Sequence, residues 1–226
     1  LILKQSKLIL CNSISTANDL HKFYKVPMHK LFPIKLGFDN NKYYPIKKIR
    51  KKFFLIIGRH NPHKNLRRVI KAFAYSKIND YKLIFVGPFD KRHTPILLKL
   101  IDKHNIRHLC VWKGWIDDDE KLSLLNECHA LIIASLWEGF GLPALEAMAC
   151  GTPVIASDRG ALREVMGNYG YFINPFNIQS IACAMNAVIN DKKCFEKALQ
   201  EGPSRAESFN WLDTARTIEK IIQEID

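Results

Sequence analysis

The chain has 226 residues, of which 47% are hydrophobic and 11% aromatic, and this is enough to bury a sizeable globular core. No apolar run approaches the roughly 20 residues that span a bilayer, and the first residues, Leu1-Ile-Leu-Lys, resemble neither an initiator start nor a signal peptide. This composition excludes the membrane-spanning and disordered classes. We therefore expect a cytoplasmic protein, and the missing initial methionine indicates a fragment or a processed product.

The cysteines and histidines show no motif of a zinc finger, a zinc protease or a disulfide framework. The six cysteines form no C-x-x-C pair, and the eight histidines form no H-E-x-x-H pattern. We therefore expect a reduced compartment, no protein-bound metal and no cofactor.

The formal charge of +12 is concentrated in one segment. No acidic residue occurs between Asp39 and Asp80, and the basic residues of that interval account for the whole net charge. They are Lys42, Lys47, Lys48, Arg50, Lys51, Lys52, Arg59, Lys64, Arg67, Arg68, Lys71 and Lys77. Such a run is equally consistent with a solvated surface and with an anionic partner. The sequence shows no zinc finger, helix-turn-helix or aromatic RNA-binding signature, so a polyphosphate ligand or an anionic membrane is favoured over nucleic acid.

The first 45 residues read as a small unit followed by a linker. The expected elements are a strand over residues 7–11, a helix over 16–24 capped by Ser15, a strand over 31–36 and a turn over 37–41. Tyr43-Tyr44-Pro45 and the lysine run after it favour a linker. We therefore place a domain boundary near residue 45, between segments 1–45 and 46–226.

After residue 46, short buried strands alternate with amphipathic helices. The expected strands cover residues 53–57, 81–86, 111–113, 130–134, 154–156 and 171–173. The expected helices cover residues 66–77, 95–104, 118–128, 144–150 and 162–166, and further helices begin near residues 178, 194 and 211, the last running to the end. This alternation predicts an α/β fold with a Rossmann-like parallel sheet and helices on both faces. Ligands of such sheets bind at the C-terminal ends of strands, where the loops 58–64, 87–90 and 136–142 lie.

The segment from Ser135 to Pro153 carries the most functional information. A buried strand, a glycine-bearing loop and a helix with Pro143 in its first turn make an anion site, because the amino end of a helix carries partial positive charge. Glu138 in the loop and Glu146 in the helix add two carboxylates, which can accept hydrogen bonds from vicinal hydroxyls. This combination predicts a ligand with both phosphates and hydroxyls.

Arg59 and Lys64 follow the strand at residues 53–57, just before the next helix. Either cation alone is typical of surface charge, but beside a second anion-binding loop the pair can hold a diphosphate leaving group. For Trp137 we expect buried aromatic packing, although it or Phe140 could also stack on a sugar or base.

Three ordered motifs resemble those of the family 4 glycosyltransferases, retaining enzymes of the GT-B fold. The segment Glu138-Gly-Phe-Gly-Leu-Pro-Ala-Leu-Glu146 is similar to the family's donor-site signature. The segment Gly58-Arg-His-Asn-Pro-His-Lys64 resembles its phosphate-binding loop, and the segment Gly114-Trp-Ile-Asp-Asp-Asp-Glu-Lys-Leu122 resembles its base-side segment. The likeness runs from about residue 5 to the end of the chain.

The resemblance implies a metal-independent, retaining hexosyl transfer from a UDP-, GDP- or ADP-sugar to a saccharide or lipid-linked acceptor. Arg59, Lys64 and Glu138 would be the catalytic-side residues, with both cations on the diphosphate and Glu138 on the transferred sugar. The remaining donor-site residues would be Gly139, Phe140, Gly141 and Leu142 beside the diphosphate, Glu146 on the ribose, and Ile116 and Lys121 beside the base. The implied pathways are polysaccharide or lipopolysaccharide biosynthesis, with peripheral contact at the cytoplasmic face of an anionic membrane.

In such an enzyme, residues 1–45 would end the acceptor domain, residues 46–226 would form the donor domain, and the last helix would pack back toward the N-terminal side. Most of the acceptor domain is absent from these residues, so we expect weak nucleotide binding and no sugar transfer by the chain alone. Two alternatives remain open. One is another GT-B enzyme, such as a nucleotide-sugar 2-epimerase or a phosphorylase, and the other is a non-enzymatic module that binds nucleotide or membrane through its basic run.

Overall fold

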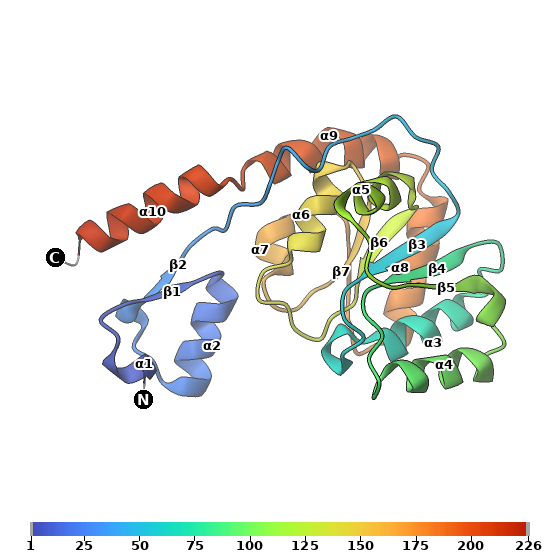
Figure 1. Ribbon diagram of the computed structural model, residues 1–226, viewed down its shortest axis with the longest axis horizontal. Helices are drawn as coiled ribbons and strands as arrows, with labels where there is room; N and C mark the ends of the chain where they lie inside the picture. Colours follow the sequence, from blue (N-terminus) through green and yellow to red (C-terminus); the bar gives the residue numbers. More distant parts are fainter. Residues whose placement is uncertain (1, 225–226) are drawn as a thin grey trace.

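The computed structural model describes residues 2–224, and its main feature is a six-stranded sheet with strand order β5-β4-β3-β6-β7-β8 (Figure 1). Every pair of neighbouring strands in this sheet is parallel. The strands are β3 (Phe53–Ile57), β4 (Lys82–Val86), β5 (Cys110–Lys113), β6 (Ala130–Ile133), β7 (Val154–Ser157) and β8 (Tyr171–Ile173). The predicted α/β fold with a parallel sheet is confirmed.

Helices cover both faces of the sheet because its strands are apolar on both sides. In β3, Phe54 and Ile56 belong to one hydrophobic cluster, while Phe53 and Leu55 belong to another. The first cluster includes residues of α3 (Leu66–Ser76), α4 (Thr94–Lys103) and α8 (Ile178–Asn190). The second includes residues of α5 (Asp118–Glu127), α6 (Leu142–Ala149), α7 (Leu162–Met166) and α9 (Cys194–Glu207). Short 3₁₀ turns, η2 (Pro62–Lys64) and η3 (Arg107–Leu109), lie in the loops.

The strand order changes direction beside β3. The chain runs from β3 outward through β4 to β5, and then returns so that β6 pairs with the other edge of β3. Such a reversal separates the loops that follow the two central strands and leaves room for a ligand at the C-terminal end of the sheet. The loops after β3 and β6 are those that carry the two strongest sequence motifs.

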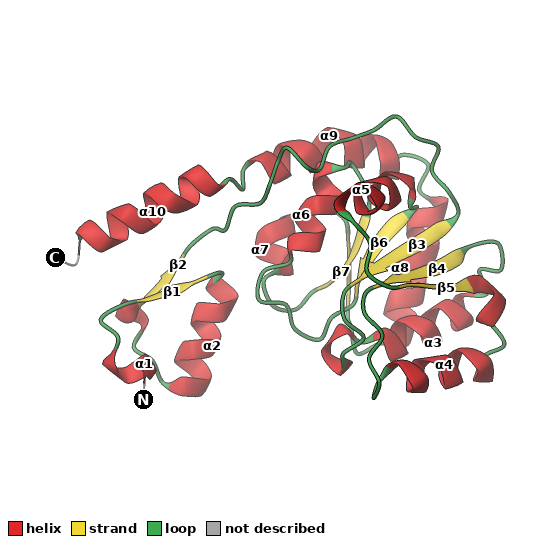
Figure 2. Cartoon of the chain, viewed as in Figure 1, coloured by secondary structure: helices red, strands yellow, loops and turns green. Residues whose placement is uncertain are grey.

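A smaller unit lies beside the sheet and is reached by a long linker and by the last helix (Figure 2). It contains α1 (Ile2–Gln5), β1 (Ile9–Cys11), α2 (Ile14–Tyr24), η1 (Met28–Lys30) and β2 (Leu31–Pro33). Helix α10 (Trp211–Gln223) runs along the linker, and the Thr214 hydroxyl donates to the Lys35 carbonyl at 2.7 Å. The expected helical end at residue 226 lies outside the described residues.

The expected cap of α2 is wrong by two residues. Ser13, and not Ser15, caps the helix by accepting the amide of Thr16. The reason is a distant carboxylate: Glu164 of α7 accepts the amides of Ile14 and Ser15 at 2.9 and 3.0 Å. Because these are first-turn N–H groups, the contact lets the helix start earlier and joins the N-terminal unit to the sheet unit.

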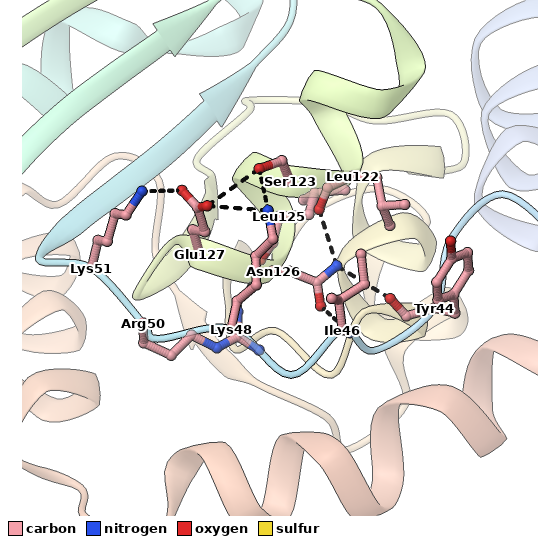
Figure 3. A network of polar contacts seen from close by, with 10 residues as sticks. All are labelled: Tyr44, Ile46, Lys48, Arg50, Lys51, Leu122, Ser123, Leu125, Asn126 and Glu127. Atoms are coloured by element: carbon pink, nitrogen blue, oxygen red, sulfur yellow. Dashed lines mark hydrogen bonds and ion pairs between the residues drawn. The ribbon is translucent and has the colours of Figure 1, made fainter.

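The linker is fixed to α5 by polar contacts (Figure 3). The Asn126 side chain accepts the amide of Ile46 and donates to the Tyr44 carbonyl. The Arg50 guanidinium turns inward and donates to the carbonyls of Leu125 and Gly151 at 2.9 and 2.8 Å. Burial lowers the pKa of Arg50, but the surrounding carbonyls satisfy its donors. Part of the basic run is therefore structural.

We predict that Arg50→Met lowers the free energy of unfolding by about 2–4 kcal/mol, because several buried carbonyls lose their donor together. Urea denaturation measures this change. The control, Lys47→Ala, removes an exposed lysine of the same segment and should change stability by less than about 0.5 kcal/mol. Equal effects of the two substitutions would contradict the structural role of Arg50.

Candidate functional site

The two motif loops contact each other at the point where the strand order reverses. The amide of Leu136, after β6, donates to the carbonyl of His63, after β3, at 2.7 Å. Asn65 joins a third segment, since its side-chain amide donates to the carbonyls of Ala134 and Pro175 at 3.0 and 2.7 Å. Asn65 is the N-cap residue of α3, but its side chain makes no cap hydrogen bond and instead holds three loop segments together.

Lys64 and Glu138 form an ion pair across this junction. The Lys64 ammonium lies 2.6 Å from Glu138 Oε1, which also accepts a hydrogen bond from the Ser135 hydroxyl at 2.6 Å. Both charged side chains are mostly buried, with exposed fractions of 20% and 15%. The structure thus brings Lys64 and Glu138 together, whereas Arg59 is exposed and has no ion pair among the described residues. The ion pair fixes Lys64, and the role of both cations at a diphosphate stays a prediction.

A second lysine–carboxylate pair lies on the other side of α6. The Lys121 ammonium is 2.7 Å from Glu146 Oε1, and Glu146 is 8% exposed. The buried Tyr43 of the linker lies beside this pair, and its pKa is raised first by burial and then by the charge of Glu146. The other carboxylate oxygen, Glu146 Oε2, is buried and has no hydrogen-bond partner in the described part of the chain. It therefore keeps free capacity to accept a hydroxyl.

Between these two pairs begins α6, whose amino end faces the loop after β6. Gly141 precedes the helix with a φ of 113°, a value that favours glycine, and Pro143 occupies its first turn. Pro143 has no N–H group, and the amides of Ala144 and Leu145 donate to the Gly141 carbonyl. Of the first-turn amides of α6, that of Leu142 is therefore left to bind an anion, since its N-cap residue offers no side-chain cap bond. Gly139 and Leu142 flank this position, and Leu142 is partly exposed. The arrangement provides cations, amides and carboxylates around one helix end.

The expected roles of the two aromatic residues in this loop are reversed. Trp137, expected to be buried, is 42% exposed, whereas Phe140 is 8% exposed and packs edge-on against Phe209 of the α9–α10 junction at 5.9 Å between ring centroids. The short loop turns Phe140 inward, where it packs against Phe209, and leaves Trp137 facing outward. Trp137 is thus available to a ligand and Phe140 is part of the core.

The third loop, residues 87–90, supports the site but does not enter it. A Cβ added to Gly87 would lie 2.1 Å from the carbonyl oxygen of Gly58, so both glycines allow the two loops to touch. The Asp90 carboxylate accepts the amides of Arg92 and His93 and points to α4.

Ile116, which the sequence resemblance places beside the nucleotide base, is half-buried against the core.

Several contacting residues were not predicted from the sequence. They include Ser135 beside Glu138, Tyr43 beside Glu146, and Gly160, whose added Cβ would lie 2.4 Å from the Glu138 carbonyl oxygen. Asn12 of the N-terminal unit also reaches the loop, 3.3 Å from a Cβ placed on Gly139. Among these residues, Gly160 is the one whose role could have been inferred locally, because a glycine before α7 indicates a left-handed turn. The contacts of Tyr43 and Asn12 join distant segments and leave no local sequence signal.

Comparisons with known proteins agree on one family. A model of the family described as "Glycosyl transferases group 1" matches residues 40–205. The curated relatives include O-antigen chain mannosyltransferase B of Escherichia coli, 27% identical over 96% of this chain and 60% of that protein. Alpha-1,3/1,6-mannosyltransferase ALG2 of Dictyostelium discoideum is 29% identical over 96% of this chain and 54% of that protein. The chain spans less than two thirds of either relative.

Solved structures with the same fold include sucrose-phosphate synthase of Thermosynechococcus elongatus, with a TM-score of 0.87, 23% identity, and coverage of 99% of this chain and 59% of that one. Anabaena HepE in complex with UDP and glucose gives a TM-score of 0.88 at 21% identity over 97% of this chain and 64% of that one. These neighbours are GT-B glycosyltransferases, which confirms the predicted fold class.

A shorter structure matches the sheet unit. The C-terminal domain of a glycosyl transferase group 1 family protein from Francisella tularensis is 28% identical with a TM-score of 0.67, and the match covers 76% of this chain and 97% of that one. The family model covers most of the described sheet unit, including Arg59, Glu138 and Glu146. The chain therefore belongs to the group 1 glycosyltransferases.

Proposed function

We propose that the junction of the loops after β3 and β6 binds the donor of a retaining, metal-independent family 4 glycosyltransferase. The observation that carries the proposal is the geometry around α6. Two lysine–carboxylate pairs, Lys64–Glu138 and Lys121–Glu146, flank an uncapped helix end. A nucleoside diphosphate sugar has the same order of groups, with an anionic diphosphate between two hydroxyl-bearing rings.

The diphosphate would be held by Lys64, Arg59 and the amides of residues 139–142. The Lys64 ammonium has three N–H donors, so it can keep its bond to Glu138 and still donate to a phosphate oxygen. Arg59 is exposed and free to close on the ligand. When the bond to the anomeric carbon breaks, the diphosphate gains negative charge, and fixed cations and amides stabilise that charge most strongly where water is excluded.

The two carboxylates would recognise the sugars. Glu146 would accept the ribose hydroxyls, with Ile116 and Lys121 beside the base. Glu138 would accept a hydroxyl of the transferred sugar through the oxygen that is not engaged by Lys64 and Ser135. This division of roles assigns one carboxylate to each ring.

The relatives support a hexose donor and a saccharide or lipid-linked acceptor. They include an O-antigen chain mannosyltransferase and an alpha-1,3/1,6-mannosyltransferase, so mannose is the sugar we propose. The described residues supply the donor side, and Asn12 is the part of the N-terminal unit that reaches it. We further propose that sugar transfer requires acceptor-binding residues beyond those of this chain.

Calorimetry with UDP, GDP and ADP should show binding of one nucleotide, and Lys64→Ala or Arg59→Ala should weaken it about tenfold to a hundredfold through loss of a charge-assisted bond. Glu146→Gln should also weaken binding, because an amide accepts ribose hydroxyls less well. Lys47→Ala, an exposed lysine of the linker, is the matched control. If all of these variants bind like the parent chain, the donor site is elsewhere.

A second variant tests Glu138 without altering its charge. Gly160→Ala places a Cβ 2.4 Å from the Glu138 carbonyl oxygen at a residue whose φ is +65°, so the Glu138 loop must shift. We expect a larger loss of affinity for the nucleotide sugar than for the nucleotide alone. Gly114→Ala is the control, because no atom lies within 4 Å of its added Cβ. An equal loss for sugar-bearing and sugar-free ligands would contradict the role of Glu138.

A further inference from the structure

The structure divides the basic run by what each cation contacts. Four linker lysines are ion-paired: Lys42 with Asp118, Lys48 and Lys51 with Glu127, and Lys52 with Asp80. Arg50 is turned inward, as Figure 3 shows, and Lys64 is paired in the donor site. Most of the linker charge is thus engaged within the chain.

A group of cations without ion pairs in the described chain lies on the opposite face of the sheet, on α3 and α4. Arg67 and Lys71 of α3 have no ion pair within residues 2–224, and both line two adjoining hollows of about 750 and 650 Å³. The first hollow also contains Arg68 and His93, and the second contains Lys103 and His104. We call these hollows together the α3–α4 groove.

No carboxylate lines the α3–α4 groove within the described chain. The nearest acidic residues along the sequence are already engaged. The Asp90 carboxylate accepts backbone amides, and Asp102 is paired with Arg107. The positive potential of the groove is therefore not compensated locally, and it fits an anionic ligand.

Apolar side chains lie beside these cations. Tyr75, Ile96 and Phe176 line the groove and are 61%, 45% and 51% exposed. Phe176 is flanked by two guanidinium groups, those of Arg68 and Arg159, each 5.5 Å from its ring centroid. A purely electrostatic site for a soluble polyanion has no use for exposed aliphatic and aromatic groups. Cations interleaved with aromatic side chains are typical of surfaces that enter the headgroup region of a membrane.

We propose that the α3–α4 groove docks on an anionic bilayer and receives phospholipid headgroups. Arg67, Lys71 and Lys103 would bind the lipid phosphates, and Tyr75, Ile96 and Phe176 would enter the interfacial region. The proposal does not depend on the donor site, which uses other side chains, although residues 60–62 and Leu136 of the two donor-site loops also line the groove.

The test is co-sedimentation of the 226-residue chain with vesicles of phosphatidylcholine alone or of an equimolar mixture with phosphatidylglycerol. The chain should bind only the anionic vesicles, and Arg67→Gln/Lys71→Gln should reduce the partition coefficient about thirtyfold, as expected for two cations at an anionic surface. The control Lys47→Gln/Lys192→Gln removes the same charge from exposed residues outside the groove and should change partitioning less than about threefold. Ile96→Ser should also weaken binding, but without changing its salt dependence.

Equal losses in the two double variants would assign binding to overall charge and overturn the proposal. Failure of the parent chain to bind anionic vesicles would overturn it as well. Calorimetry with inorganic phosphate tests whether the groove binds a free phosphate in place of a lipid headgroup. If the parent chain binds phosphate but no vesicles, and Arg67→Gln/Lys71→Gln abolishes phosphate binding, the groove is a site for a soluble anion. Nucleotide affinity should be unchanged in Arg67→Gln/Lys71→Gln, so this test and the donor-site test fail independently.

Discussion

The return of β6 to the free edge of β3 is the constraint on which the site depends. Because both strands are parallel and end at the same edge of the sheet, two loops separated by more than 70 residues meet there and form the Lys64–Glu138 pair. Asn65 fixes the junction, since its amide bonds to the ends of two other segments. Without the pairing of β3 with β6, the loops after these two strands would not meet and Lys64 could not reach Glu138.

The chain uses its positive charge in three ways that sequence composition does not distinguish. Arg50 and the lysines that pair with Asp118 and Glu127 attach the linker to α5, Lys64 stands in the proposed donor site, and Arg67 and Lys71 line a groove on α3. Desolvation explains the difference: a cation can be buried only where carbonyls or carboxylates replace its water. Net charge therefore says little about function until the partners of each residue are known.

Local signals predicted much of the fold and part of the site. The strand over residues 53–57 and the helix over residues 118–128 were identifiable because each depends on residues a few positions apart. The start of α2 was not, because several residues near Ser13 can cap a helix and the choice follows from Glu164, about 150 residues away. The exposure of Trp137 likewise follows from Phe209, which fills the core beside Phe140.

The site residues themselves were predicted from motif spacing, but their mutual contacts required strand order. That Lys64 is already bound to Glu138, and Lys121 to Glu146, is visible only in three dimensions. In our proposal these pairs keep both carboxylates oriented in a partly dry site, so that a donor exchanges partners with them instead of ordering free side chains.

A crystal structure of the chain with bound GDP or UDP tests the central proposal most directly. We predict a diphosphate within hydrogen-bonding distance of Lys64, Arg59 and the first amides of α6, with the ribose hydroxyls on Glu146. A nucleotide seated in the α3–α4 groove, with the Lys64–Glu138 junction unchanged and unliganded, would contradict the account.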